Sequence, residues 1–88
     1  MRVRIRLFAS FREAAGTKEV ELEVRDGSKV SDVMRKLSEH FPKLKEMLFK
    51  GDEIREDYHV VKGGRWLKGN DLLLDGDQIA LFPMVGGG

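Results

Sequence analysis

The carboxyl-terminal residues are the part of this 88-residue chain whose type and position could do chemistry. The sequence ends Gly86-Gly87-Gly88, and a run of glycines has no side chains that could help to pack a fold. Without Cβ atoms, such a segment can enter a narrow cleft on a partner and present its terminal carboxylate there. Residues 85–88 span roughly 13–14 Å when extended. Two interpretations follow: a carboxylate that reacts inside a partner, or an incidental glycine-rich end of a kind common at chain termini.

No other group of residues has the spacing of an active site. His40 and His59 lack spaced Asp, Glu or His partners, so the sequence predicts no metal site. The absence of cysteine excludes a disulfide scaffold, a thiolate nucleophile and a cysteine-ligated metal. Gly63-Gly64 lacks both the Lys-Ser/Thr signature and the following helix of a phosphate loop, so we interpret it as a turn. We therefore expect no self-contained active site.

Composition excludes several classes of partner. Sixteen basic and fifteen acidic residues leave a net charge of +1, which argues against a nucleic-acid-binding protein. No apolar run approaches the ~20 residues of a membrane span, so no membrane contact is expected. The first residues alternate charged and apolar side chains, which a signal peptide does not do. The expected location is the cytoplasm.

Residues 2–8 and 19–24 alternate charged and apolar side chains, the pattern of half-buried strands. Arginines fill the polar face of the first segment and glutamates that of the second. If the two pair antiparallel, opposite charges meet, and each such pair contributes about 0.2–1 kcal/mol. We predict a hairpin with a wide connection over residues 9–18. The apolar faces are Val3, Ile5 and Leu7, then Val20, Leu22 and Val24; the charged faces are Arg2, Arg4 and Arg6, then Glu19, Glu21 and Glu23.

A helix is predicted after the Asp26-Gly27 turn. Ser28 or Ser31 is the expected cap, because serine accepts hydrogen bonds from first-turn N–H groups. The helix should end near His40, since Pro42 disfavours helical geometry in the residue before it, and Pro42 can open a short second turn. The residues at helical spacing are Val30, Val33, Met34 and Leu37.

The second half of the chain is predicted to hold further strands. Residues 50–57 are expected to be a solvated loop, and residues 58–61 and 78–82 to be strands, the last of them ended by Pro83. Strands with one main helix indicate an α+β domain, with a mixed sheet packed on that helix.

An exposed aromatic patch is predicted on the sheet. Phe8 shares the parity of the arginines, and Phe82 lies opposite in parity to Ile79 and Leu81. Together with Trp66 in a nearby turn region, these rings are typical of a partner surface. The alternative is that Phe8 and Phe82 lie at strand ends and tuck beneath a loop.

Three segments resemble the small subunit of molybdopterin synthase, in the MoaD/ThiS group of ubiquitin-related sulfur carriers. They are residues 7–16, Leu-Phe-Ala-Ser-Phe-Arg-Glu-Ala-Ala-Gly, residues 75–83, Asp-Gly-Asp-Gln-Ile-Ala-Leu-Phe-Pro, and the terminal glycines. The resemblance implies a ubiquitin-like β-grasp fold over residues 1–83 and a flexible glycine tail over residues 84–88. It also implies that the first and last strands lie side by side at the sheet centre.

The resemblance implies a chemistry for the tail. A ubiquitin-activating-type enzyme would use ATP and magnesium to adenylate the carboxylate of Gly88, and a persulfide donor would supply sulfur to form a thiocarboxylate. The tail, kept thin by Gly86 and Gly87, would then enter the molybdopterin synthase large subunit and give its sulfur to the pterin precursor. The chain itself would bind no cofactor. The implied partner-binding residues are Phe8, Trp66, Phe82 and Pro83.

Two departures from the family pattern leave this chemistry possible. The tail has three glycines where a pair suffices, and Met84 stands where many relatives have a second proline. Relatives with this fold and ending serve thiamine synthesis or tRNA thiolation, and some archaeal ones are joined to protein lysines. Chain length and a helical insert near residues 42–49 favour the molybdopterin branch. A ubiquitin-like modifier and a plain β-grasp binding module remain alternatives.

Overall fold

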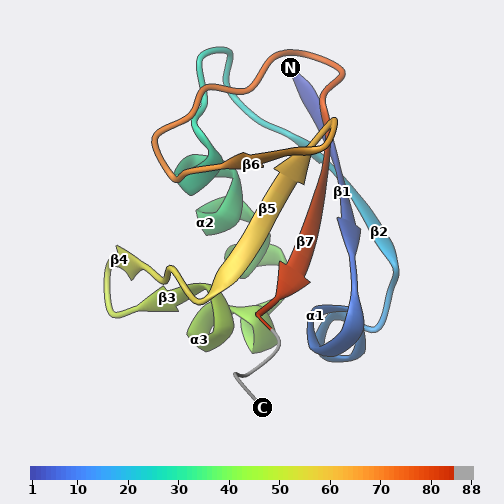
Figure 1. Ribbon diagram of the computed structural model, residues 1–88, viewed down its shortest axis with the longest axis vertical. Coiled ribbons are helices and arrows are strands. Elements are labelled where there is room, and N and C mark those ends of the chain that lie inside the picture. Colours follow the sequence, from blue (N-terminus) through green and yellow to red (C-terminus); the bar gives the residue numbers. More distant parts are fainter. Residues whose placement is uncertain (85–88) are drawn as a thin grey trace.

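A five-stranded mixed sheet packed on one main helix forms the body of the protein (Figure 1). The computed structural model describes residues 1–84. The strand order is β2-β1-β7-β5-β6; β1 and β7 are parallel neighbours, and the other pairs are antiparallel. This is the predicted ubiquitin-like β-grasp arrangement. The elements are β1 (Arg2–Leu7), α1 (Ala9–Ala15), β2 (Glu19–Glu23), α2 (Val30–His40), a 3-10 turn (Pro42–Leu44), α3 (Lys45–Leu48), β3 (Phe49–Lys50), β4 (Glu53–Ile54), β5 (Tyr58–Lys62), β6 (Arg65–Leu67) and β7 (Gln78–Pro83).

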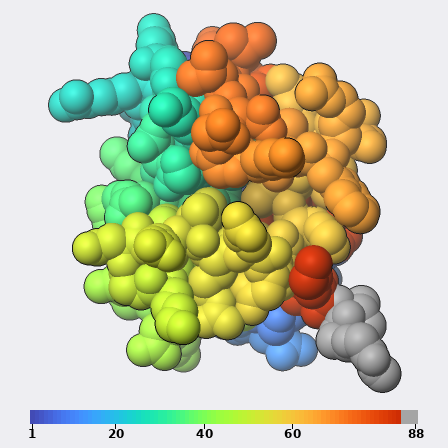
Figure 2. Space-filling view, turned by 60° about the vertical axis from the view of Figure 1, so that its left-hand side comes forward, coloured from blue at the N-terminus to red at the C-terminus, as the bar shows by residue number. Residues whose placement is uncertain are grey.

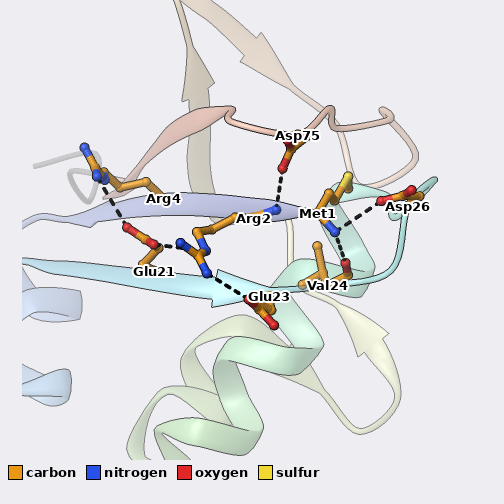
Figure 3. Close-up of polar contacts among 8 residues, drawn as sticks. All are labelled: Met1, Arg2, Arg4, Glu21, Glu23, Val24, Asp26 and Asp75. Atoms are coloured by element: carbon orange, nitrogen blue, oxygen red, sulfur yellow. Dashed lines mark hydrogen bonds and ion pairs between the residues drawn. The ribbon is translucent and has the colours of Figure 1, made fainter.

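The β1–β2 hairpin has the predicted register. Arg2 lies opposite Glu23 and Arg4 opposite Glu21, so basic and acidic side chains meet on the outer face of the sheet. Arg2 Nη2 lies 2.9 Å from Glu23 Oε1, and Arg4 Nη2 lies 3.3 Å from Glu21 Oε2 (Figure 3). The Arg2 backbone N–H also donates to Asp75 Oδ1 at 2.8 Å, which joins this hairpin to the turn before β7.

The core lies between the sheet and α2. The apolar residues of β1 are no more than 1% exposed, as are the four apolar residues predicted on the helix face. Leu81 and Ile79 of β7 lie in the same cluster. The helix ends at His40, and Pro42 begins a 3-10 turn, as predicted. Among the helices of residues 1–84, none combines the length and hydropathy needed to cross a membrane.

Residues 9–18 are more ordered than the predicted wide connection. They contain α1, which begins at Ala9, one residue after β1, and is capped at its end by Gly16 with a left-handed backbone. Phe11 is its one buried residue, and the Phe11 ring meets the Tyr58 ring edge-on at 5.6 Å. A seven-residue helix with one buried position shows no helical periodicity in the sequence, which explains why the pattern did not reveal it.

The predicted serine cap of α2 is wrong. Lys29 is the N-cap, and its backbone N–H donates to Asp32 Oδ2 at 2.9 Å. Ser28 turns away and donates from Oγ to the Arg25 carbonyl at 2.6 Å, while Ser31 lies inside the helix. Asp32, in the first turn, thus provides a capping hydrogen bond, and its negative charge interacts favourably with the positive end of the helix dipole.

Residues 50–57 also differ from the predicted loop. Strands β3 and β4 form a small hairpin there, in which Phe49 lies opposite Ile54. Phe49 is buried, and the Tyr58 hydroxyl donates to the Leu48 carbonyl at 3.1 Å. Burial raises the pKa of Tyr58, so this hydroxyl keeps its proton and the hydrogen bond that joins β5 to α3.

Candidate functional site: the aromatic sheet face and the tail exit

Strand β7 carries the chain out of the centre of the sheet. It lies between β1 and β5 and ends at Pro83, which is opposite Tyr58. The Met84 N–H then donates to the Asp57 carbonyl at 3.4 Å, and Figure 2 shows the red end of the described chain against the yellow segment. The predicted tail residues Gly86, Gly87 and Gly88 lie outside the described residues.

Four aromatic side chains lie in a row across the outer face of the sheet, close to this exit. The Phe8 and Phe82 rings stack with centroids 4.3 Å apart and planes 10° apart. Phe82 lies opposite His59 in the strand register. His59 in turn stacks on Trp66, with centroids 4.5 Å apart. We call Phe8, Phe82, His59 and Trp66 the aromatic row; it runs from the end of β1 over β7 and β5 to β6.

The structure brings together the three aromatic residues predicted from the sequence. Phe8 and Phe82 are each half-buried and stack on one another, and Trp66 is 72% exposed. Trp66 lies in β6 rather than in a turn. Their roles in partner binding, and that of the half-buried Pro83, stay predictions.

Sequence reasoning missed His59 as a member of the row. The signal was present in β5, where Tyr58 and Val60 are buried and His59 therefore points to the opposite face. Its contact with Trp66 depends on the β5–β6 register. That register follows from the Gly63-Gly64 turn, in which both glycines have positive φ, as the tight hairpin turn that matches strand twist requires.

The backbone around Phe8 is held on two sides. The Phe8 N–H donates to the Leu81 carbonyl of β7 at 3.2 Å, and the Phe8 carbonyl accepts from the Phe11 N–H at 3.2 Å. Between them, Ala9 takes a φ of +50°, which is uncommon for a residue with a Cβ atom. This left-handed residue turns the chain from strand to helix in one step and leaves Phe8 lying on Phe82.

The polar groups beside the exit are an ion pair, not an acid–base pair. Arg55 donates from Nε and Nη2 to the two carboxylate oxygens of Asp57, at 3.1 and 2.8 Å. These hydrogen bonds lower the pKa of Asp57, so its carboxylate is charged at neutral pH and offers no proton. Within residues 1–84, no cluster of three His, Cys, Asp or Glu residues could hold a metal ion.

A cavity of about 720 Å³ opens on the other face of the sheet. It lies among the segments visible in Figure 2 as the start of α2, the yellow β3–β4 hairpin and the orange loop after β6. Its walls mix apolar residues such as Val30 and Val60 with charged residues such as Lys29 and Arg55. The first N–H groups of α2 are already used, because Val30 donates to the Asp71 carbonyl and Ser31 to that of Gly69, each at 2.9 Å. The cavity therefore lacks free backbone donors for an anion at this helix.

Comparison with known proteins assigns this chain to a family. Residues 5–88 match the ThiS family. The chain belongs to the ThiS family. This is a family of ubiquitin-like sulfur carriers, and the predicted resemblance is confirmed at that level.

Three similar proteins illustrate the range of the ThiS family. Small archaeal modifier protein 3 of Haloferax volcanii is 36% identical over 92 residues, with 100% of both chains covered. The crystal structure of SAMP1 from Haloferax volcanii gives a TM-score of 0.91 at 29% identity, again with 100% of both chains covered. The molybdopterin synthase sulfur carrier subunit of Chlamydomonas reinhardtii is 27% identical over 90 residues and covers 100% of both chains.

The site of this ThiS-family chain is thus a surface and an exit rather than a pocket. Its strands present stacked rings on one face, and its last strand ends beside them at Pro83. Such an arrangement can dock a partner and direct the following residues into it.

Proposed function

We propose that this chain carries sulfur on its carboxyl-terminal glycine and delivers it as the small subunit of molybdopterin synthase. The observation that best supports the proposal is the end of β7 at the sheet centre, beside the aromatic row. A glycine tail follows it in the sequence, which can pass through a narrow channel. A partner docked on the row would lie within reach of Gly88, four residues after Met84 in the sequence.

The reaction must begin with activation, because a carboxylate is a poor electrophile whose leaving group would be oxide. A ubiquitin-activating-type enzyme would use ATP and magnesium to form an acyl-adenylate at Gly88, with release of pyrophosphate. The terminal sulfur of a persulfide donor would displace AMP, and a second thiol would cleave the sulfur–sulfur bond to leave a thiocarboxylate. ATP and magnesium belong to the activating enzyme in this scheme.

The chain would contribute positioning rather than catalysis. The aromatic row supplies apolar area for binding first the activating enzyme and then the synthase large subunit. Pro83 ends the last strand, and Gly86 and Gly87, which have no side chains, would let the tail enter a closed active site. A cytoplasmic location is part of this proposal.

A second candidate function is protein modification. The similarity to small archaeal modifier protein 3 and to SAMP1 favours it. The same adenylate at Gly88 would then pass to a lysine amine of a target protein, which forms an isopeptide bond. Sulfur delivery for tRNA thiolation would share the thiocarboxylate and differ only in the acceptor.

The first test is the intact mass of the protein after incubation with ATP, magnesium, a matching activating enzyme and a persulfide source. We expect a gain equal to the replacement of one oxygen by sulfur, located at Gly88. Deletion of Gly86 to Gly88, or addition of one residue after Gly88, should abolish the gain and leave the circular dichroism spectrum unchanged. No mass change with an enzyme active on another carrier would overturn the sulfur-carrier proposal and favour a plain binding module.

The acceptor is tested separately. Thiocarboxylated protein mixed with the large subunit and the pterin precursor should yield molybdopterin in a single turnover. Recovery of lysine-linked conjugates from the native cell, together with no molybdopterin in that assay, would replace the first candidate function with the second.

A further inference from the structure

Arg6 is the unpaired member of an otherwise paired charge ladder. Arg2 contacts Glu23 at 2.9 Å and also Glu21 at 3.2 Å. Arg4 reaches past its opposite residue to contact Glu19, with Nε 3.0 Å from Oε1. Glu19 is the residue opposite Arg6 in the register. This offset of one step leaves Arg6 without an ion pair among residues 1–84.

The free guanidinium lies at the edge of the aromatic row. Arg6 Cζ is 5.6 Å from the centre of the Phe8 ring, on the same face of the sheet. In the register Arg6 lies opposite Ala80, two residues before Phe82. An arginine beside a ring keeps its N–H donors open to a planar carboxylate, and the ring attracts its positive charge. The exposed surface beside the exit thus combines one cation with a run of apolar rings.

We propose that Arg6 and the aromatic row form one docking site for a partner segment that carries a carboxylate beside an apolar side chain. The carboxylate would pair with Arg6, and the apolar side chain would cover Phe82. Charge complementarity favours a negatively charged partner group, because Arg2 and Arg4 are paired with glutamates whereas Arg6 has no ion pair within residues 1–84. Opposite charges at such a rim fix orientation and speed association.

The occupant is the enzyme that adenylates the tail. This step of the argument rests on the proposed function. A protein that encloses the residues after Met84 must lie over the end of the sheet where Phe8 and Phe82 stack. Adenylation precedes both sulfur transfer and lysine conjugation, so the activating enzyme is the partner that both candidate functions share. Its docking surface should therefore hold an Asp or Glu next to an apolar residue.

The test measures binding to the activating enzyme from the same organism, with ATP and magnesium, for Arg6→Met and Arg6→Glu. Arg2→Met is the matched control, because Arg2 lies on the same strand and face but is paired with glutamates. We expect Kd to rise roughly tenfold for Arg6→Met and more for Arg6→Glu, the loss typical of a charged hydrogen bond. The Arg2→Met variant should bind within about twofold of wild type. The Arg6→Met effect should shrink at high salt, since an exposed ion pair is screened.

The possible results separate the inference from the function on which it rests. If wild type is adenylated but Arg6→Met and Arg6→Glu bind as tightly, the inference is wrong and the proposed function stands. Equal losses in Arg6→Met and Arg2→Met would also overturn it, since they indicate a general charge effect. If wild type neither binds nor is adenylated, both fail. Thermal unfolding shows whether each variant is folded. If Arg6→Glu does not fold, the binding of Arg6→Met, which keeps an unbranched side chain, tests the inference by itself.

Discussion

Ala9 shows how one residue shapes the site. Its φ of +50° places an L-residue in the left-handed region, which costs roughly 1–2 kcal/mol relative to the right-handed one. Glycine avoids that cost but loses more chain entropy on folding. We expect Ala9→Gly to raise the free energy of unfolding by about 0.5–1 kcal/mol in chemical denaturation.

Ala14→Gly is the matched control for this substitution. Ala14 lies within α1, where glycine is less favourable than alanine by about 1 kcal/mol. The two changes should therefore shift stability in opposite directions. A loss of stability in Ala9→Gly would show that Ala9 is not strained, and the account of how Phe8 is positioned would need another cause.

Two adjacent residues of strand β7 have different roles, one in the core and one on the outer face of the sheet. Leu81 is 0% exposed in the core, whereas Phe82 lies half-buried on the outer face. Leu81→Ala should cost about 2–5 kcal/mol of stability, because it leaves a cavity in a packed interior. Phe82→Asp should instead weaken binding to the activating enzyme far more than it weakens folding. Thermal melts and binding titrations on both variants check this; a larger melting loss for Phe82→Asp than for Leu81→Ala would place Phe82 in the core.

Elements with a sustained period could be predicted from the sequence. The alternation in residues 2–8 and the helical spacing in residues 30–37 each repeat often enough to stand out, and both elements were predicted correctly. Strands β3 and β4 are two residues each, too short to display alternation, and α1 has a single buried position. Tertiary packing, rather than local pattern, specifies these three.

At the scale of the whole molecule, the site depends on contacts between distant segments. Parallel pairing of β1 with β7 brings Phe8 against Phe82, and no local pattern in either strand reveals that pairing. Their adjacency was expected only because of the family resemblance. The His59–Trp66 stack arises from a diagonal contact across the β5–β6 hairpin, which a pattern of alternation cannot supply. Alternation in the sequence thus indicates which rings face outward, whereas the pairing of the strands determines which rings are in contact.

Acid stability of the whole fold should depend on Asp77, which joins β5 to the start of β7. Asp77 Oδ2 accepts from Lys62 Nζ at 2.9 Å and from the Leu74 N–H at 2.7 Å. Burial alone would raise the pKa of Asp77, but these two hydrogen bonds outweigh it and lower the pKa below its ordinary value of 3.8. A carboxyl group with a lowered folded-state pKa stabilises the fold above its unfolded pKa, and that contribution is lost as pH falls through the folded pKa.

We therefore expect wild type to lose stability as pH falls below about 4. Asp77→Asn should be less stable by about 1 kcal/mol at neutral pH, where the charged acceptor is lost, and should show a shallower decline in acid. Lys62→Gln removes one of the two interactions that hold the pKa of Asp77 down, so its decline should begin at a higher pH than that of wild type. Urea unfolding between pH 2 and pH 7 measures all three proteins. Parallel curves would mean that Asp77 does not link the fold to pH, and that other carboxylates with lowered pKa, such as Glu23 beside Arg2, carry the acid sensitivity.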